Sequence, residues 1–344
     1  MMKNKLLKKN IRHFCLTNEN ILHSTLDNLI FINDEKIYES NKNLQNIYFR
    51  GSNAYTNTDD GDSLEINIKN KNIQLIENEF LKYVDYSFKI ITKDKKTIIQ
   101  CIDGNLTTLK LFRIFIYLLD KNSKNLIYYE GNNLTNSEIN IKVTSLIKDE
   151  DYLSFPVSSL GTWLDGSLKK PYQVSEFSGI YNKTLVCTMS SGAVLLLDIE
   201  KGTVKQFFKD AKVRSGIFQK EENSPIFMGL KHYTFIEINA ETCEMLRQID
   251  IQEELKRVAN IPKENPCWLT VGTSIYQNGL FYFYGDTNLL GIFDPITEKI
   301  IDYHWFDFDK KKHQQLKGGI ENLQVKDEKI YCLDTLGNLY ELEK

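Results

Sequence analysis

The chain has 344 residues, of which 42% are hydrophobic and 26% are charged, enough for a sizeable buried core. Its formal net charge of −3 gives no general attraction for nucleic acid, whose binding usually needs a basic patch or stripe. No apolar run reaches the ~20 residues of a membrane-spanning helix, and the basic start of the chain lacks the apolar core of a signal peptide. We therefore expect no nucleic-acid partner, no membrane contact and a cytoplasmic location.

Period-two patterning dominates the first 130 residues, in which short apolar runs alternate with polar breaks. The pattern predicts β-hairpins over Asn28–Asn41, Thr97–Phe112 and 114–131, and an alternating strand pattern within Ser63–Glu77. Helical stripes with a period of 3.6 residues are nearly absent, and no stretch rich in Pro, Gly and Ser divides the chain. The sequence predicts an all-β protein with one domain spanning residues 1–344.

A repeated unit becomes clear in the second half of the chain. Lys183–Phe208 contains three apolar runs separated by two tight polar breaks, and the same order recurs in Ile226–Ile249 and Leu280–Phe306. The last segment, Lys329–Lys344, supplies two such runs before the sequence stops. An insertion between the second and third units, Glu253–Trp268, is predicted to begin as one short helix that ends at Pro262.

Repeats of short antiparallel strands every ~40–50 residues are typical of β-propeller blades. A four-stranded blade cannot cover both of its apolar faces alone, so neighbouring blades stack face to face. This length suits seven blades, with six blades plus insertions as the alternative. Because the last repeat is incomplete, we expect a strand near the N-terminus, from Asn10–Leu16 or Asn28–Asn33, to complete the final blade.

The units resemble the repeats of the quinoprotein/YVTN/WD40-like propeller superfamily, most clearly over residues 180–344. In that superfamily a strand ends in Asp before a turn that bears Thr or Gly. The corresponding pairs are Asp198/Thr203, Asn239/Thr242 and Asp294/Thr297. The resemblance implies a fold and no particular activity, because propellers host many functions.

The sequence contains no reaction signature that we can identify. The five histidines never pair at metal-ligand spacing, and Asn57–Asn67 only superficially resembles a calcium loop, since Asn67 stands where a bidentate Glu belongs. The six scattered cysteines lack a C-x-x-C pair and are predicted to be reduced thiols, mostly buried. We predict no catalytic residue, no metal site and no cofactor.

Aromatic residues beside charged ones are typical of protein-binding surfaces. Such residues concentrate in Asp302–His313 and in two predicted inter-blade loops around Trp163 and Trp268. The candidate partner-binding residues are Trp163, Trp268, Tyr303, Trp305, Phe306, Asp307 and Asp309. The two aspartates, on one face of a predicted strand, suit steering of a basic partner, although they equally suit catalysis, a cation site or a solvated edge.

These observations favour a non-catalytic, protein-binding propeller. One specific form is a bacterial immunity protein that sequesters a cognate effector toxin by covering the active site of its toxic domain. A basic toxin domain is one such partner. The alternatives are an assembly scaffold and a propeller enzyme with its active site in the central funnel, such as a lactonase or a quinone- or metal-dependent hydrolase or dehydrogenase.

Overall fold

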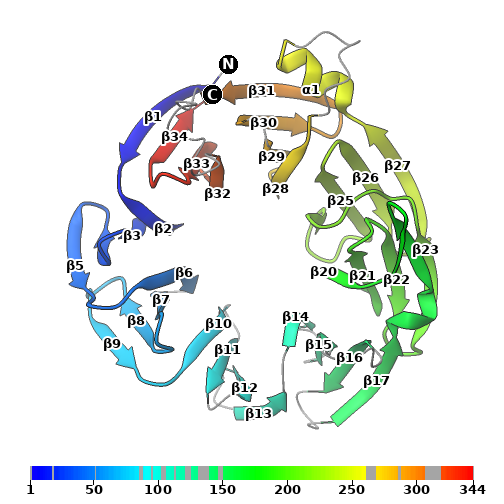
Figure 1. Ribbon diagram of the computed structural model, residues 1–344, viewed down its shortest axis with the longest axis horizontal. Coiled ribbons are helices and arrows are strands. Elements are labelled where there is room, and N and C mark those ends of the chain that lie inside the picture. Colours follow the sequence, from blue (N-terminus) through cyan, green and yellow to red (C-terminus); the bar gives the residue numbers. More distant parts are fainter. Residues whose placement is uncertain are drawn as a thin grey trace. The chain divides into compact units, whose positions relative to one another are not determined.

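The structure is a computed structural model (Figure 1) that describes residues 2–17, 19–50, 52–84, 88–93, 96–101, 106–111, 114–120, 125–130, 139–145, 150–260, 269–285, 288–306 and 319–343. It has two compact units: unit 1 is Met1–Phe112 with Asp307–Lys344, and unit 2 is Arg113–Phe306. The described residues are mainly in antiparallel strands, with a single short α-helix among them, which confirms the predicted all-β class. The single domain over residues 1–344 stays a prediction.

The described strands of unit 1 form four antiparallel sheets of four strands each. In the order of hydrogen bonding, these sheets are β1 (Lys3–Lys8), β34 (Leu339–Glu343), β33 (Lys329–Asp334) and β32 (Ile320–Lys326); β2 (Ile11–Leu16), β3 (Ile21–Thr25), β4 (Leu29–Ile32) and β5 (Glu35–Glu39); β6 (Leu44–Arg50), β7 (Asn53–Thr58), β8 (Ser63–Asn67) and β9 (Ile73–Ile76); and β10 (Phe80–Val84), β11 (Phe88–Lys93), β12 (Lys96–Cys101) and β13 (Leu106–Leu111).

Unit 2 has four more sheets of the same kind among its described residues. They are β14 (Ile114–Asp120), β15 (Asn125–Glu130), β16 (Asn140–Ser145) and β17 (Glu150–Pro156); β20 (Val174–Tyr181), β21 (Thr184–Met189), β22 (Val194–Asp198) and β23 (Thr203–Phe208); β24 (Ile217–Gln219), β25 (Ile226–Lys231), β26 (Thr234–Asn239) and β27 (Glu244–Asp250); and β28 (Val271–Gln277), β29 (Leu280–Gly285), β30 (Leu289–Asp294) and β31 (Lys299–Trp305). A separate two-stranded sheet lies between β17 and β20 in the sequence.

The described residues thus contain eight four-stranded sheets, where the sequence predicted seven such repeats, with six as the alternative. The prediction was too low because the early repeats are short. The first strands of the early sheets begin at Ile11, Leu44, Phe80 and Ile114, so each repeat is more compact than the ~40 residues of a typical blade. Because tight turns shorten these repeats, the same chain length accommodates one more sheet.

The strand that completes the sheet of β32, β33 and β34 comes from the N-terminus, as predicted (Figure 1). It is β1, however, and not the later segments that the sequence favoured: Asn10–Leu16 contains β2, which begins the next sheet, and Asn28–Asn33 contains β4. β1 is the outer strand and is largely exposed, so its lysine-rich sequence shows no apolar alternation. Gln324 links the two sheets, because its Nε2 donates to the Phe14 carbonyl at 3.0 Å and its Oε1 accepts the Leu16 N–H at 2.9 Å.

The sheet of β20 to β23 shows how stacking covers both faces of these strands. Every residue of β21 and β22 is buried. Leu185 and Leu195 pack with side chains of the sheet before it in the sequence, such as Ile127. Val186 and Leu196, which point to the opposite face, pack with side chains of the following sheet. Burial of a side chain of this kind contributes about 1.5–3 kcal/mol, so neighbouring sheets hold each other in place.

The polar residue that ends each third strand of the repeat forms a turn. The Asp198 carboxylate accepts the backbone N–H groups of Glu200 and Lys201 at 3.0 Å each, and Asn239 and Asp294 make the same kind of bond to residues two positions on. Such side chains satisfy backbone donors that the strand no longer can. The repeated Asp or Asn is therefore explained by turn chemistry.

Gly291 in β30 lies directly opposite Phe283 in β29. A methyl group at this position would lie 2.4 Å from Cζ of the buried Phe283 ring. We expect Gly291→Ala to lower the free energy of unfolding by about 2 kcal/mol, the usual cost of overpacking a core, as measured by urea denaturation. Adding Phe283→Leu should make the double change less costly than the sum of the single changes; an unchanged midpoint for Gly291→Ala would contradict the close packing.

The predicted helix within the insertion is present as α1 (Gln252–Val258). Its acidic residues Glu253 and Glu254 occupy the first turn and its basic residues Lys256 and Arg257 the last turn, the arrangement that the helix dipole favours. Among the described residues no helix is long and apolar enough to span a membrane. The predicted end at Pro262 lies outside the described residues.

Candidate protein-docking surface

A short hairpin stands apart from the four-stranded sheets of unit 2. Its strands are β18 (Thr162–Asp165) and β19 (Leu168–Pro171), which pair only with each other among the described strands. The preceding 3₁₀ turn, η1 (Val157–Leu160), ends at Gly161, whose φ of 86° favours glycine. Gly166, with a φ of 63°, opens the two-residue turn between the strands, as in a type II′ hairpin. We call β18 and β19 the docking hairpin.

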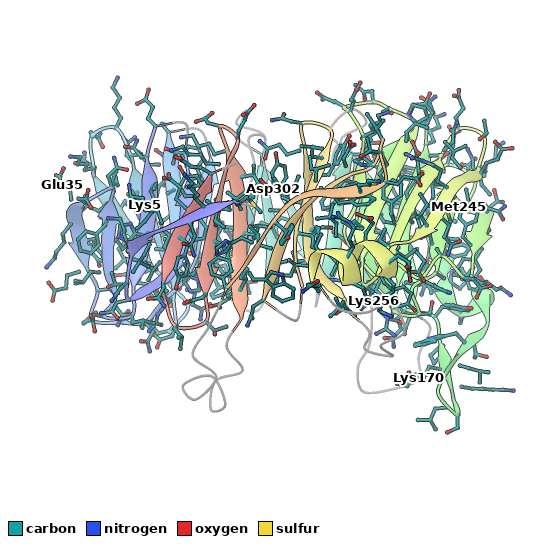
Figure 2. The ribbon with its side chains drawn as sticks, turned by 90° about the horizontal axis from the view of Figure 1, so that it is seen from above. Lys5, Glu35, Lys170, Met245, Lys256 and Asp302 are labelled. Atoms are coloured by element: carbon teal, nitrogen blue, oxygen red, sulfur yellow. The ribbon has the colours of Figure 1, made fainter. Side chains whose placement is uncertain are left out.

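The docking hairpin, which carries Lys170, extends beyond the neighbouring strands of unit 2 (Figure 2). Leu164 and Leu168 are 64% and 62% exposed, among the highest values for large apolar side chains in the described part of the chain. They lie on opposite faces of the hairpin, because Leu164 pairs with Lys169 and Leu168 with Asp165. Water therefore contacts an apolar side chain on each face of a projecting element.

Trp163 anchors the base of the docking hairpin. Its ring is partly buried and packs against the core cluster between β14–β17 and β20–β23. The Arg214 guanidinium carbon lies 6.0 Å from the ring centroid, within reach of a cation–π interaction. The Trp163 Nε1 atom is buried and has no acceptor among the described residues. The structure thus places this predicted binding residue beneath the exposed leucines, where it supports the hairpin.

Basic groups outnumber acidic ones on the docking hairpin and at its base. Lys169, Lys170 and Arg214 are exposed, whereas Asp165 is the one carboxylate of the hairpin. Asp165 forms an ion pair with Lys170, and Lys170, followed by Arg214, lowers the pKa of the Asp165 carboxyl. At neutral pH Asp165 is ionised, and its negative charge is balanced by the positive charge of Lys170. Lys169 and Arg214 therefore leave the hairpin and its base with a net positive charge.

The other predicted aromatic residues belong to a different part of unit 2. Tyr303 and Trp305, on β31, are partly buried against the core cluster that includes α1, and Trp305 Nε1 donates to the Val258 carbonyl of α1 at 3.4 Å. Phe306 is 6% exposed and packs edge-to-face on His304 at 4.8 Å. These three residues meet one core cluster and Trp163 meets another. Trp268, Asp307 and Asp309 lie outside the described residues.

Unit 1 contains an open cavity of about 1090 Å³ that the sequence did not indicate. It lies where β2, β4, β6 and β8 end, between two neighbouring sheets, and combines apolar side chains with amides and charged groups. Asp34 at its edge pairs with Lys8 at 2.5 Å, and Glu35 pairs with Lys71. Its lining comes from four separate turns, so no local motif marks it.

The titratable residues do not gather into a cation site in the part of the chain that the structure describes. No group of three or more His, Cys, Asp and Glu side chains there is placed to hold a metal ion. Burial raises the pKa of the Cys187 and Cys332 thiols far above the ordinary value, so both are protonated, as expected for buried cysteines.

Known proteins resemble this chain in structure, but no significant resemblance in sequence was found. No protein-family model matches the chain, and no curated protein matches its sequence. Among solved structures, the chain is similar to a computationally designed protein, Ika8, with a TM-score of 0.64 and 10% identity, over 99% of this chain and 98% of the other. BamB from Moraxella catarrhalis matches with a TM-score of 0.59 and 10% identity over 99% and 96%.

Sqt1 of Saccharomyces cerevisiae matches with a TM-score of 0.62 and 9% identity, over 100% of this chain and 97% of that protein. At this level of identity the likeness concerns the fold alone. Together with the four-stranded antiparallel sheets, it shows that the chain has a β-propeller fold.

Proposed function

We propose that this β-propeller is a protein-binding module and that the docking hairpin is its principal contact surface. The observation that carries the proposal is the exposure of Leu164 and Leu168 on an element outside the four-stranded sheets. These side chains contribute little to the core, whereas burial of each in a complex would contribute about 1.5–3 kcal/mol. Trp163 and Arg214 hold the hairpin base in place, which limits the entropy lost on binding.

Changing both exposed leucines to aspartate, Leu164→Asp with Leu168→Asp, tests this proposal. A partner is first recovered from the source cells by cross-linking and purification, and its Kd is then measured with the purified components. We expect the double variant to bind at least tenfold more weakly, because it removes apolar burial and places two charges in the interface. The thermal unfolding midpoint should change little, since neither side chain is buried.

The matched control is Leu75→Asp, which also replaces an exposed strand leucine by a charged residue. Leu75 is 47% exposed and lies on β9 of unit 1. This variant should bind the partner as the unchanged protein does. Equal binding by the hairpin double variant and the unchanged protein would exclude the docking hairpin as the contact surface.

We further propose an immunity role in a bacterial cytoplasm, in which the propeller sequesters a toxic effector domain. A rigid scaffold with an exposed binding element is sufficient for such an inhibitor, because covering the active site requires no chemistry. Asp307 and Asp309, together with Tyr303, stay candidates for steering a basic toxin domain. This role predicts a toxin-like gene immediately upstream, and co-expression with its toxic domain should restore growth. Absence of such a gene, or of protection, would reject this role.

A further inference from the structure

The two strands of the docking hairpin have very different outer edges. Each strand of a two-stranded sheet pairs along one edge only and leaves its other backbone edge without a strand partner, as holds for β18 and β19 among the described residues. Natural proteins protect such edges with lysine and proline. β19 carries Lys169, Lys170 and Pro171, whereas β18 has neither residue type and reads Thr-Trp-Leu-Asp. Only β19 is protected.

The register shows which backbone groups the open edge of β18 presents. Thr162 pairs with Pro171, and because proline has no N–H, this cannot be a pair that exchanges two hydrogen bonds. Hydrogen-bonded and non-hydrogen-bonded pairs alternate in an antiparallel ladder, so Leu164 opposite Lys169 is also a non-hydrogen-bonded pair. The backbone N–H and C=O groups of Thr162 and Leu164 therefore point away from β19, along the open edge.

We propose that the open edge of β18 accepts an extended segment of the partner protein as a third strand of the docking hairpin. This inference rests on the proposed protein-binding function and specifies how the contact is made. Strand addition supplies main-chain hydrogen bonds, and pockets or exposed side chains alongside supply selectivity. The isolated hairpin gains from it, because two-stranded sheets are at best marginally stable in water.

The charges and side chains beside this edge define the partner segment. The exposed Leu164 matches an apolar residue in the added strand, since cross-strand apolar pairs stabilise sheets. The residues between the apolar ones lie on the face of Trp163 and Lys170. There Lys170 and Arg214 outnumber Asp165, which is paired with Lys170. An acidic side chain in the added strand meets this positive field, whereas a basic one is repelled. The partner segment is thus extended, apolar on alternate residues and acidic between them.

The test uses two fluorescent peptides of eight residues, one alternating valine with glutamate and one alternating valine with lysine, titrated into the full chain by fluorescence anisotropy. We expect the acidic peptide to bind at least tenfold more tightly than the basic one. Thr162→Pro removes one outward N–H donor and should weaken acidic-peptide binding at least tenfold. The matched control Thr162→Val keeps this donor and should leave the affinity within twofold.

A second measurement on the unchanged protein avoids any effect of proline on folding. Hydrogen exchange should show the Thr162 and Leu164 amides protected by the acidic peptide. Failure of the peptide to bind, equal effects of Thr162→Pro and Thr162→Val, or no protection of these amides would overturn strand addition. A dimer of this chain that Thr162→Pro dissociates would also overturn it, since the occupant would be a second copy.

The two proposals fail in different ways. If Leu164→Asp with Leu168→Asp abolishes binding of the natural partner but Thr162→Pro leaves it intact, the side chains of the hairpin make the contact and strand addition is wrong, while the protein-binding function stands. If neither change affects the natural partner, both the proposed surface and the added strand are rejected.

Discussion

Replacement of Lys3–Lys8 by a glycine–serine segment of equal length is expected to lower the free energy of unfolding of the protein by about 3–5 kcal/mol. The replacement removes β1, whose residues pair with β34 from Lys3 opposite Glu343 to Lys8 opposite Leu339. Each backbone hydrogen bond contributes about 0.5–1.5 kcal/mol, and glycine adds an entropic cost in a strand. Urea denaturation followed by circular dichroism measures the loss.

The control for this experiment is the same kind of replacement in Leu168–Pro171. That change removes β19 but leaves every four-stranded sheet complete, so the unfolding midpoint should stay close to that of the unchanged protein. A glycine–serine variant of Lys3–Lys8 with full stability would show that closure of the last sheet contributes nothing.

Acid is expected to destabilise unit 1 through His23. Its side chain is 3% exposed and stacks on Phe31 at 5.1 Å, and burial, followed by the positive charge of Lys8, lowers its pKa from 6.5 to about 4. Below pH 6.5 the unfolded chain therefore binds a proton before the folded chain does. Stability is present above pH 6.5 and is lost as the pH falls towards 4, by about 3 kcal/mol at most for this residue.

The variant His23→Phe keeps an aromatic ring beside Phe31 and removes the titration. Between pH 7 and pH 4.5 it should lose about 2 kcal/mol less stability than the unchanged protein, as measured by urea denaturation at each pH. His13, whose burial and neighbour Arg12 lower its pKa to about 4, keeps part of the acid sensitivity in this variant. If the stability of the two proteins depended on pH in the same way, His23 would be excluded as a cause of the acid sensitivity.

Continuous apolar runs predicted most of the central strands, because these strands are buried on both faces. The run from Val194 to Leu197 is an example: each of its residues is buried against one neighbouring sheet or the other, and such runs are visible in the sequence. The first and last strands of the sheets are harder to predict. β20 is partly exposed along most of its length, and β1 is rich in lysine, so neither shows a clear period-two pattern.

The candidate surface was only partly predictable for a related reason. An aromatic-rich loop drew attention to Trp163, yet the structure buries part of that ring and exposes Leu164 and Leu168 instead. A leucine in a short alternating run normally indicates a core strand. Its exposure depends on the hairpin remaining outside the neighbouring sheets, which is a property of tertiary structure. Likewise, Trp305 is identified as a support for α1 only by its contact with Val258.

The pairing of β1 with β34 also constrains synthesis of the protein. Glu343, the strand partner of Lys3, is synthesised more than 300 residues after Lys3. At ~5–20 residues per second, β1 waits roughly 20–70 s without its native neighbour, while the intervening sheets can already form. Unit 1 is thus completed only after β34 has been synthesised, and a ribosome that stalls before β34 leaves β1 without its strand partner.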